Sequence, residues 1–324
     1  MILRSRNKEG GVSPSLSSEK RVRRVATKSF KSYLPLFFML IPGIIYFILF
    51  CYVPMFGIVI AFKDYHLMEG IVDSPWVGMK YFNQLFSDPY FYTVLKNTLL
   101  ISLMKLLFGF PMPILFAVLL NEIRLAKFKK FVQTASYLPH FISWIALAGI
   151  LKSFLSLDGT VNSILAFFGL DPIMFLSEPG YFRAVLVISD IWKGFGWGAI
   201  IYFAAIAGVD NSLHEAAAID GATRLQRIRY ITLPGIAFMV VIMLILSMAN
   251  ILNAGFDQIF NLYNSAVMEV SDIVDTYMYR VGIQQVQYSL STALGIFKSV
   301  VALILIVVTN RLAKKLDSDY STLW

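Results

Sequence analysis

The chain alternates long apolar segments with short polar ones. Predominantly apolar residues fill six segments, at 34–62, 94–120, 131–155, 182–209, 234–257 and 289–313. Each segment is close to, or longer than, the roughly 20 residues that a helix needs to cross the hydrocarbon core of a bilayer. The pattern predicts an all-α integral membrane protein with about six transmembrane helices in one domain, residues 35–313. Kinks are expected at Pro111 and Pro113.

The composition points to lipid as the solvent of this domain. Hydrophobic residues make up 57% of the chain and charged residues 15%, whereas a soluble domain has about 45–50% and about 25%. Cys51 is the only cysteine, which excludes a disulfide within the chain. The three histidines are far apart, and their spacing predicts no metal site.

The basic residues indicate which side of the membrane each polar segment occupies. Residues 1–34 carry nine Lys or Arg and are expected to be a disordered basic tail. If this tail is cytoplasmic, the cytoplasmic segments hold 19 basic residues and the outer loops hold three. This bias predicts that both termini, including a C-terminal tail at 314–324, are cytoplasmic. The charge of +8 is spread over many short segments, so nucleic acid is not an expected partner.

The polar loop at 210–233 has a distinctive local pattern. Ser212 and Glu215 have the spacing of a capping box, which predicts the start of a short helix. Gly221 is expected to end that helix in the left-handed conformation. A second amphipathic helix should follow, and Pro234 should open the fifth span. The loop is therefore expected to be a short helix-turn-helix on the cytoplasmic face.

The same loop resembles the EAA loop of binding-protein-dependent ABC importer permeases. Glu215-Ala-Ala, Gly221 and Ile231-x-Leu-Pro234 agree with that loop at every fixed position and spacing. The resemblance implies that the loop docks into a cleft on an ATPase subunit and transmits the closure of that subunit. A surface hairpin with no partner is the alternative. The candidate coupling residues are Glu215, Ala216, Ala217, Asp220, Gly221 and Arg227.

The resemblance covers almost the whole chain and is closest to carbohydrate permeases of the MalF-like and LplB-like group. It includes residues 256–263, 271–280 and 309–312, and within the group the chain looks like the first permease subunit of an alginate-type importer. The resemblance implies a MetI/MalF-like fold in the bacterial inner membrane. It also implies a second, related permease subunit, two ATPase subunits that hold the ATP and Mg, an extracytoplasmic solute-binding protein and a carbohydrate substrate.

Polar and ionisable residues inside the apolar segments predict a path for the substrate. Such residues cost about 2.5–3.5 kcal/mol each at the centre of a membrane helix on insertion scales, and they tend to face a cavity or a partner. In the fourth and fifth segments they recur at the spacing of one helical face. The candidate path residues are Asp190, Lys193, Gly194, Trp197, Asn250, Asn253, Asp257, Lys105 and Lys298.

Two interpretations of these residues remain open. Asp190 and Lys193 have the i, i+3 spacing at which they could simply neutralise each other, with the asparagines bonding across helices. Alternatively, Trp197 beside charged and amide groups suits a sugar. Three lysines against two aspartates would favour an anionic sugar.

The chain is not expected to be an enzyme. Gly194-x-Gly196 lacks the strand and third glycine of a dinucleotide site, and these small residues are expected to permit close helix packing. Residues 295–299 lack the Gly-Lys pair of a P-loop, so a partner would hydrolyse the ATP. The alternatives are an ion-coupled secondary transporter with Asp190 and Asp257 as coupling groups, a permease for a neutral sugar or other small solute, and a receptor or scaffold.

Overall fold

The computed structural model describes residues 34–316, which are helical apart from their connections. A single isolated bridge, Lys63 to Trp76, is the only β pairing within them. The all-α expectation is therefore confirmed. The chain divides between Gly57 and Ile58 into two compact units, called unit 1 and unit 2 below. The tails expected at 1–34 and 314–324 fall largely outside the described residues.

Unit 1 is one apolar helical segment that leads into unit 2. It consists of α2 (Leu34–Phe47), the π-helical turn η2 (Ile48–Tyr52), α3 (Val53–Met55) and the start of η3 (Phe56–Phe62). Residues 37–62 are long and apolar enough to cross a membrane, and most of their side chains are exposed.

Unit 2 contains the remaining helices. In chain order these are α4 (Gly70–Asp73), α5 (Lys80–Ser87), α6 (Pro89–Met104), η4 (Lys105–Gly109), α7 (Pro111–Asn121), α8 (Ala126–Tyr137), η5 (Leu138–Phe141), α9 (Trp144–Phe154), α10 (Thr160–Phe167), α11 (Pro179–Ala207), α12 (Asn211–Ile219), α13 (Arg224–Arg227), η6 (Ile228–Thr232), α14 (Leu233–Gly235), α15 (Ala237–Ala249), α16 (Phe256–Leu262), α17 (Met268–Ser271), α18 (Val274–Tyr279), η7 (Arg280–Gln284) and α19 (Tyr288–Leu316).

The six expected spans correspond to four long helices and two bent pairs. By length and composition, four helices of the described chain can cross a membrane, or six if each bent pair is one span. The third span is broken by 101° between η5 and α9. The Ser143 hydroxyl accepts from the Ala146 amide there and starts α9 as a new helix. The fifth span bends by 60° between α14 and α15, so Pro234 lies before the bend and does not open the span.

Three of the prolines inside the spans follow π-helical turns. The turns η2, η4 and η6 end two residues before Pro54, Pro111 and Pro234, respectively. A proline lacks the N–H of the normal helical bond and crowds the carbonyl four residues earlier. A local π turn shifts that carbonyl, and residues 89–121 remain one continuous helix. The kinks expected at Pro111 and Pro113 therefore do not break this span into separate helices.

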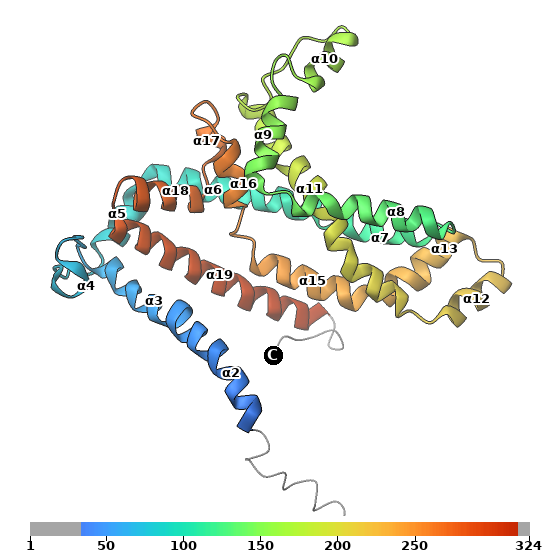
Figure 1. Cartoon of the computed structure of the whole chain (residues 1–324), viewed down its shortest axis with the longest axis horizontal. Helices are drawn as coiled ribbons and strands as arrows, with labels where there is room; N and C mark the ends of the chain where they lie inside the picture. Colours follow the sequence, from blue (N-terminus) through green and yellow to red (C-terminus); the bar gives the residue numbers. More distant parts are fainter. Residues whose placement is uncertain (1–33, 317–324) are drawn as a thin grey trace, which may run out of the picture. The chain divides into compact units, whose positions relative to one another are not determined.

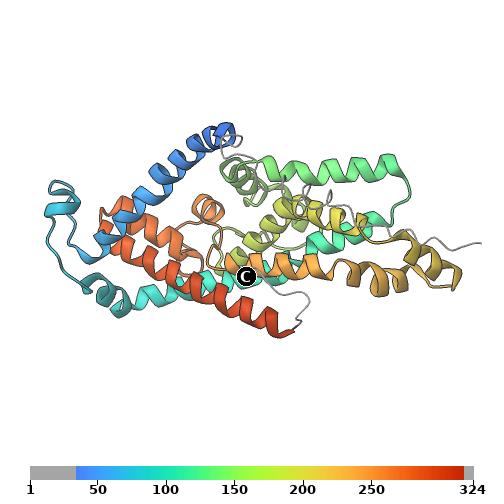
Figure 2. The same cartoon turned by 90° about the horizontal axis from the view of Figure 1, so that it is seen from below.

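The long helices of unit 2 run between two distinct ends. Figure 1 shows α5 and α18 near one end and the short helices α12 and α13 at the other, and Figure 2 shows the same order. The α7 and α11 helices pack along each other, and α11 also packs against α8. A side chain at Gly196 would collide with the backbone of Ser136 on α8. The close helix packing expected at this glycine is therefore confirmed.

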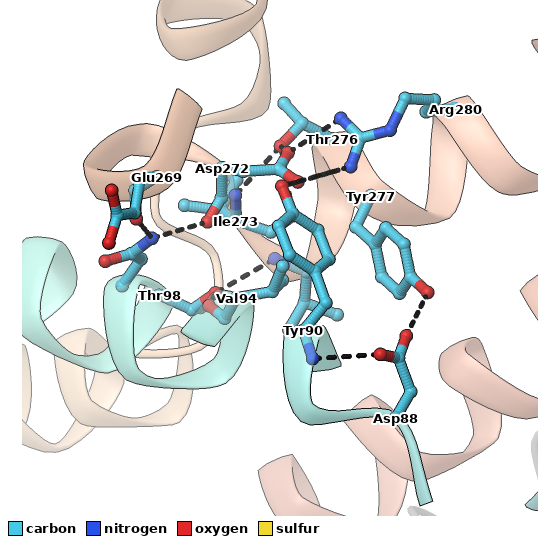
Figure 3. Close-up of polar contacts among 12 residues, drawn as sticks. Asp88, Tyr90, Val94, Thr98, Glu269, Asp272, Ile273, Thr276, Tyr277 and Arg280 are labelled. Atoms are coloured by element: carbon cyan, nitrogen blue, oxygen red, sulfur yellow. Dashed lines mark hydrogen bonds and ion pairs between the residues drawn. The ribbon is translucent and has the colours of Figure 1, made fainter. Parts of the chain in front are cut away.

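A buried polar network anchors residues 268–280 to α6 and α11. Arg183 donates to the Asn97 side-chain oxygen over 2.8 Å, and the Asn97 amide donates to the Glu269 carbonyl over 2.7 Å. Arg280 donates to the Asp272 carboxylate over 2.5 Å, and Tyr90 Oη donates to the same carboxylate over 2.6 Å (Figure 3). Asp272 is 1% exposed, so this pairing keeps a charge that would otherwise be costly inside the protein.

Candidate functional site

A cavity of about 270 Å³, the central cavity, lies among α6, η4, α11 and α15, beside the connection to α16. Its lining comes from three segments that are far apart in sequence, namely residues 102–110, Asp190 and residues 247–255. Four of the nine path residues expected from the sequence meet there. The polar lining comprises Ser102, Lys105, Asp190, Ser247, Asn250 and Asn253.

Lys105 is the cation of the central cavity. Its side chain is 12% exposed, and its ammonium donates to the Ala254 carbonyl over 2.8 Å and to Gln258 Oε1 over 2.5 Å. The Gln258 amide nitrogen donates in turn to the Leu186 carbonyl and to Ser189 Oγ, which directs its oxygen toward Lys105. Gln258 is fully buried. The sequence carried no signal for it beyond its place next to Asp257.

Asp190 completes the charges of the central cavity. One of its carboxylate oxygens lies 3.3 Å from the Lys105 ammonium, and its side chain is 39% exposed. This is the longest of the three contacts of Lys105. Of the two interpretations left open by the sequence, the ion pair between Asp190 and Lys193 does not form, because η4 and α11 bring Lys105 to Asp190 instead. The cavity therefore has one buried ammonium, a partly exposed carboxylate and two amide side chains.

Lys193 and Trp197 serve the bend of the third span and do not line the central cavity. The Lys193 ammonium donates to the carbonyls of His140 (2.6 Å) and Ile142 (2.7 Å), and it lies 5.6 Å from the centre of the Trp144 ring. Trp197 stacks on His140 with ring centroids 4.6 Å apart. A cation at the end of a helix satisfies carbonyls that the break leaves without partners. The polar residues expected to share one face of α11 therefore contact two different places. Asp190 lines the central cavity, whereas Lys193 and Trp197 contact the bend of the third span.

The polar stripe expected in the fifth span does not form one helical face. The α15 helix ends at Ala249, with Asn250 as its C-cap, and Asn253 lies in the connection that follows. Gly255 has φ +97°, a left-handed conformation, and α16 then starts a new helix. Asp257 is exposed in the first turn of α16 and does not line the central cavity. The helical spacing of these polar residues is interrupted by the end of α15 and by the left-handed Gly255, and the pattern of apolar residues in the sequence does not reveal either feature.

The two remaining path residues lie elsewhere. Lys298 on α19 pairs with Asp275 on α18 over 2.5 Å, and both side chains are mostly buried. Among residues 34–316, no atom outside the adjoining turns of α11 lies within 4 Å of where a side chain at Gly194 would begin. Neither residue lines the central cavity.

Replacing Gly255 by alanine is expected to displace Lys105. The new methyl carbon would lie 2.7 Å from the Lys105 ammonium nitrogen, and the left-handed backbone conformation would cost about 1–2 kcal/mol. The apparent melting temperature of the purified membrane complex should fall, and solute uptake should fall with it. Gly194→Ala on α11 is the matched control, and it should leave both measurements unchanged. An unaltered melting temperature for Gly255→Ala would show that Lys105 is not held as described.

The second candidate site is the hairpin formed by α12 and α13, called the coupling hairpin. Asp210 caps α12 by accepting from the Ser212 amide, so the expected Ser212–Glu215 capping box is wrong. Bonds from the Ser212 backbone and side chain lower the pKa of Asp210. Gly221 has φ +80°, which confirms the left-handed turn. A capping box starts α13 instead, with Thr223 as the cap and Gln226 as its partner.

The coupling hairpin exposes apolar side chains. Ile219 is 87% exposed and Leu225 is 74% exposed. Glu215, Ala216 and Asp220 are exposed, whereas Ala217 and Arg227 are half-buried. Exposed apolar residues gathered on a short polar loop are typical of a surface that a partner covers.

The chain is similar to known transport proteins. Residues 103–322 match the family described as binding-protein-dependent transport system inner membrane component. The chain is 47% identical, over 93% of its length and 94% of the relative, to the polygalacturonan/rhamnogalacturonan transport system permease protein YteP of Bacillus subtilis (strain 168). It is 46% identical to the protein LplB of the same organism, over 88% of this chain and 90% of that protein.

Solved structures show the same similarity. One is described as a bacterial ABC transporter involved in the import of the acidic polysaccharide alginate. Its matching chain is 41% identical, with a TM-score of 0.82 over 91% of this chain and 99% of that one. A second is that of a bacterial alginate ABC transporter in complex with an alginate pentasaccharide-bound periplasmic protein. Its matching chain is 42% identical, with a TM-score of 0.82 over 88% of this chain and 96% of that one.

Proposed function

Because the chain belongs to the family of binding-protein-dependent transport system inner membrane components, we propose that it is a permease subunit for the import of acidic oligosaccharides. The observation that carries the proposal is the buried Lys105 ammonium in the wall of the central cavity. The relatives named for polygalacturonan/rhamnogalacturonan and for alginate support an acidic substrate.

The central cavity can recognise a uronate unit if the carboxylate of that unit replaces the Asp190 carboxylate beside Lys105. Lys105 keeps two neutral acceptors, the Ala254 carbonyl and Gln258, at 2.8 and 2.5 Å. Its contact with Asp190 is longer and partly exposed. A substrate carboxylate can take that place while Asn250 and Asn253 bond to sugar hydroxyls. A neutral sugar lacks the charge for this exchange, so the site should favour acidic sugars.

The coupling hairpin would transmit ATP-driven movement to this cavity. The exposed Ile219 and Leu225 fit docking against an ATPase subunit, which would hold the ATP and Mg. The α12–α13 end of unit 2 would then face the cytoplasm, as the distribution of basic residues also predicts. The α5–α18 end would face outward, toward a solute-binding protein. A second, related permease subunit would complete the membrane part.

Uptake by the reconstituted complex tests the proposal. With the permeases, the ATPases and the solute-binding protein in proteoliposomes, ATP should drive uptake of a galacturonate trimer. Lys105→Met with Asp190→Asn removes both charges of the cavity while retaining similar side-chain sizes. This variant should lose most uptake of the trimer and keep uptake of an uncharged trisaccharide that the same binding protein delivers. Equal loss of both sugars would refute the charge argument, and uptake driven by an ion gradient without ATP would indicate a secondary transporter.

A further inference from the structure

A larger cavity, called the outer cavity, lies at the α5–α18 end of unit 2. Its volume is about 520 Å³, compared with about 270 Å³ for the central cavity. The buried side chains of Leu85, Val281 and Leu290 form part of its lining and make one wall apolar. This end of unit 2 lies opposite the coupling hairpin (Figure 1). The outer cavity is therefore remote from the ATPase-coupling surface.

Three carboxamides line the outer cavity. They belong to Gln84 on α5 and to Gln285 and Gln287 in the turn before α19. All three residues are exposed, and their side chains make no hydrogen bond with any residue that the structure describes. Val286 between the last two has φ +60°, a strained conformation for a β-branched residue. Such strain persists where function or packing compensates for it, and here it brings two carboxamides to one cavity.

Among the described residues that line the outer cavity, Arg280 is the only basic one, and it is already paired. The Arg280 guanidinium is paired with Asp272 (Figure 3). Asp88 accepts from the Tyr277 hydroxyl over 3.0 Å. Burial and this hydrogen bond raise the pKa of Tyr277 to about 12, and the phenol is the donor to Asp88. Since Arg280 and Asp272 cancel, Asp88 leaves the site with one negative charge, which disfavours a carboxylate ligand.

We propose that the outer cavity binds an uncharged sugar unit of the imported oligosaccharide. Carboxamides donate and accept at once, as sugar hydroxyls require. The rings of Tyr90 and Tyr277 and the apolar wall suit the carbon face of a sugar. The proposal rests on the carbohydrate import function above. It adds a second site that takes an uncharged unit where the central cavity takes an acidic one, which suits a chain that contains both acidic and neutral units.

Saccharide binding to the intact transporter tests this site. The complex is placed in nanodiscs without the solute-binding protein and titrated with an uncharged galactose trisaccharide. Saturation-transfer NMR measures the binding of the trisaccharide. Gln285→Ala with Gln287→Ala should weaken binding by roughly tenfold, the loss expected for two neutral hydrogen bonds. Gln284→Ala is the matched control, because Gln284 is exposed beside the cavity and does not line it.

Two outcomes would overturn the proposal. The first is the absence of trisaccharide binding to the wild-type complex. The second is unaltered trisaccharide binding in the glutamine double variant; if the solute-binding protein then associates more weakly with this variant, the cavity is a protein contact. Melting temperatures of all variants must match the wild type. ATP-driven uptake of the galacturonate trimer by wild type is measured separately, so the import function can stand when this site fails.

Discussion

Gly221→Leu in the coupling hairpin should uncouple ATP hydrolysis from uptake. Gly221 has φ +80°, a conformation that costs an L-residue about 1–2 kcal/mol. That cost corresponds to a factor of roughly 5–30 in the population of the native turn. ATP-driven uptake by the reconstituted complex should fall by about this factor, while membrane insertion and assembly of the complex persist. Parallel measurements of ATPase stimulation, uptake and the amount of assembled complex check the prediction.

A second substitution at the same position separates conformation from size. Asparagine tolerates the left-handed region better than other residues that carry a Cβ atom. Gly221→Asn should therefore retain most of the uptake that Gly221→Leu loses. Among residues 34–316, no atom beyond the two adjoining residues lies within 4 Å of where a side chain at Gly221 would begin, so a clash with these residues does not explain the loss. Full stimulation and uptake in Gly221→Leu would refute the docking role of the turn.

Lys193→Met should destabilise the complex without changing its preference for acidic sugars. The substitution removes the ammonium from the His140 and Ile142 carbonyls at the 101° bend of the third span. Hydrogen bonds to a charged group contribute about 1.5–3 kcal/mol each. The free energy of unfolding should therefore fall by about 3 kcal/mol or more, the sum for the two hydrogen bonds. The apparent melting temperature should fall, and uptake of acidic and neutral trisaccharides should fall by the same factor.

Two further variants test this prediction. Lys152→Met, an exposed lysine at the end of α9, is the matched control and should leave stability unchanged. Adding Asp190→Asn to Lys193→Met should not restore stability, because the ion-pair partner of Asp190 is Lys105. A selective loss of acidic uptake in a stable Lys193→Met complex would place Lys193 in the substrate path, contrary to the structure.

Much of the architecture could be predicted from local patterns. Apolar length alone located the membrane helices, because hydrocarbon requires about 20 apolar residues per span. The coupling hairpin was recognisable because its turn needs Gly221 and its motif occupies one continuous segment. Its first cap was predicted at the wrong residue. Asp210 and Ser212 are both good caps, and only the backbone conformation decides between them.

The polar residues of the spans mark the limit of sequence reasoning. Polarity inside apolar segments by itself identified Lys105, Asp190, Asn250 and Asn253 as exceptional, and these four meet in the central cavity. Only the tertiary structure decided which charges pair, because helix packing brings Lys105 to Asp190 from 85 residues away. It also assigned Lys193 to the bend, since the carbonyls that need a donor exist only where a helix breaks.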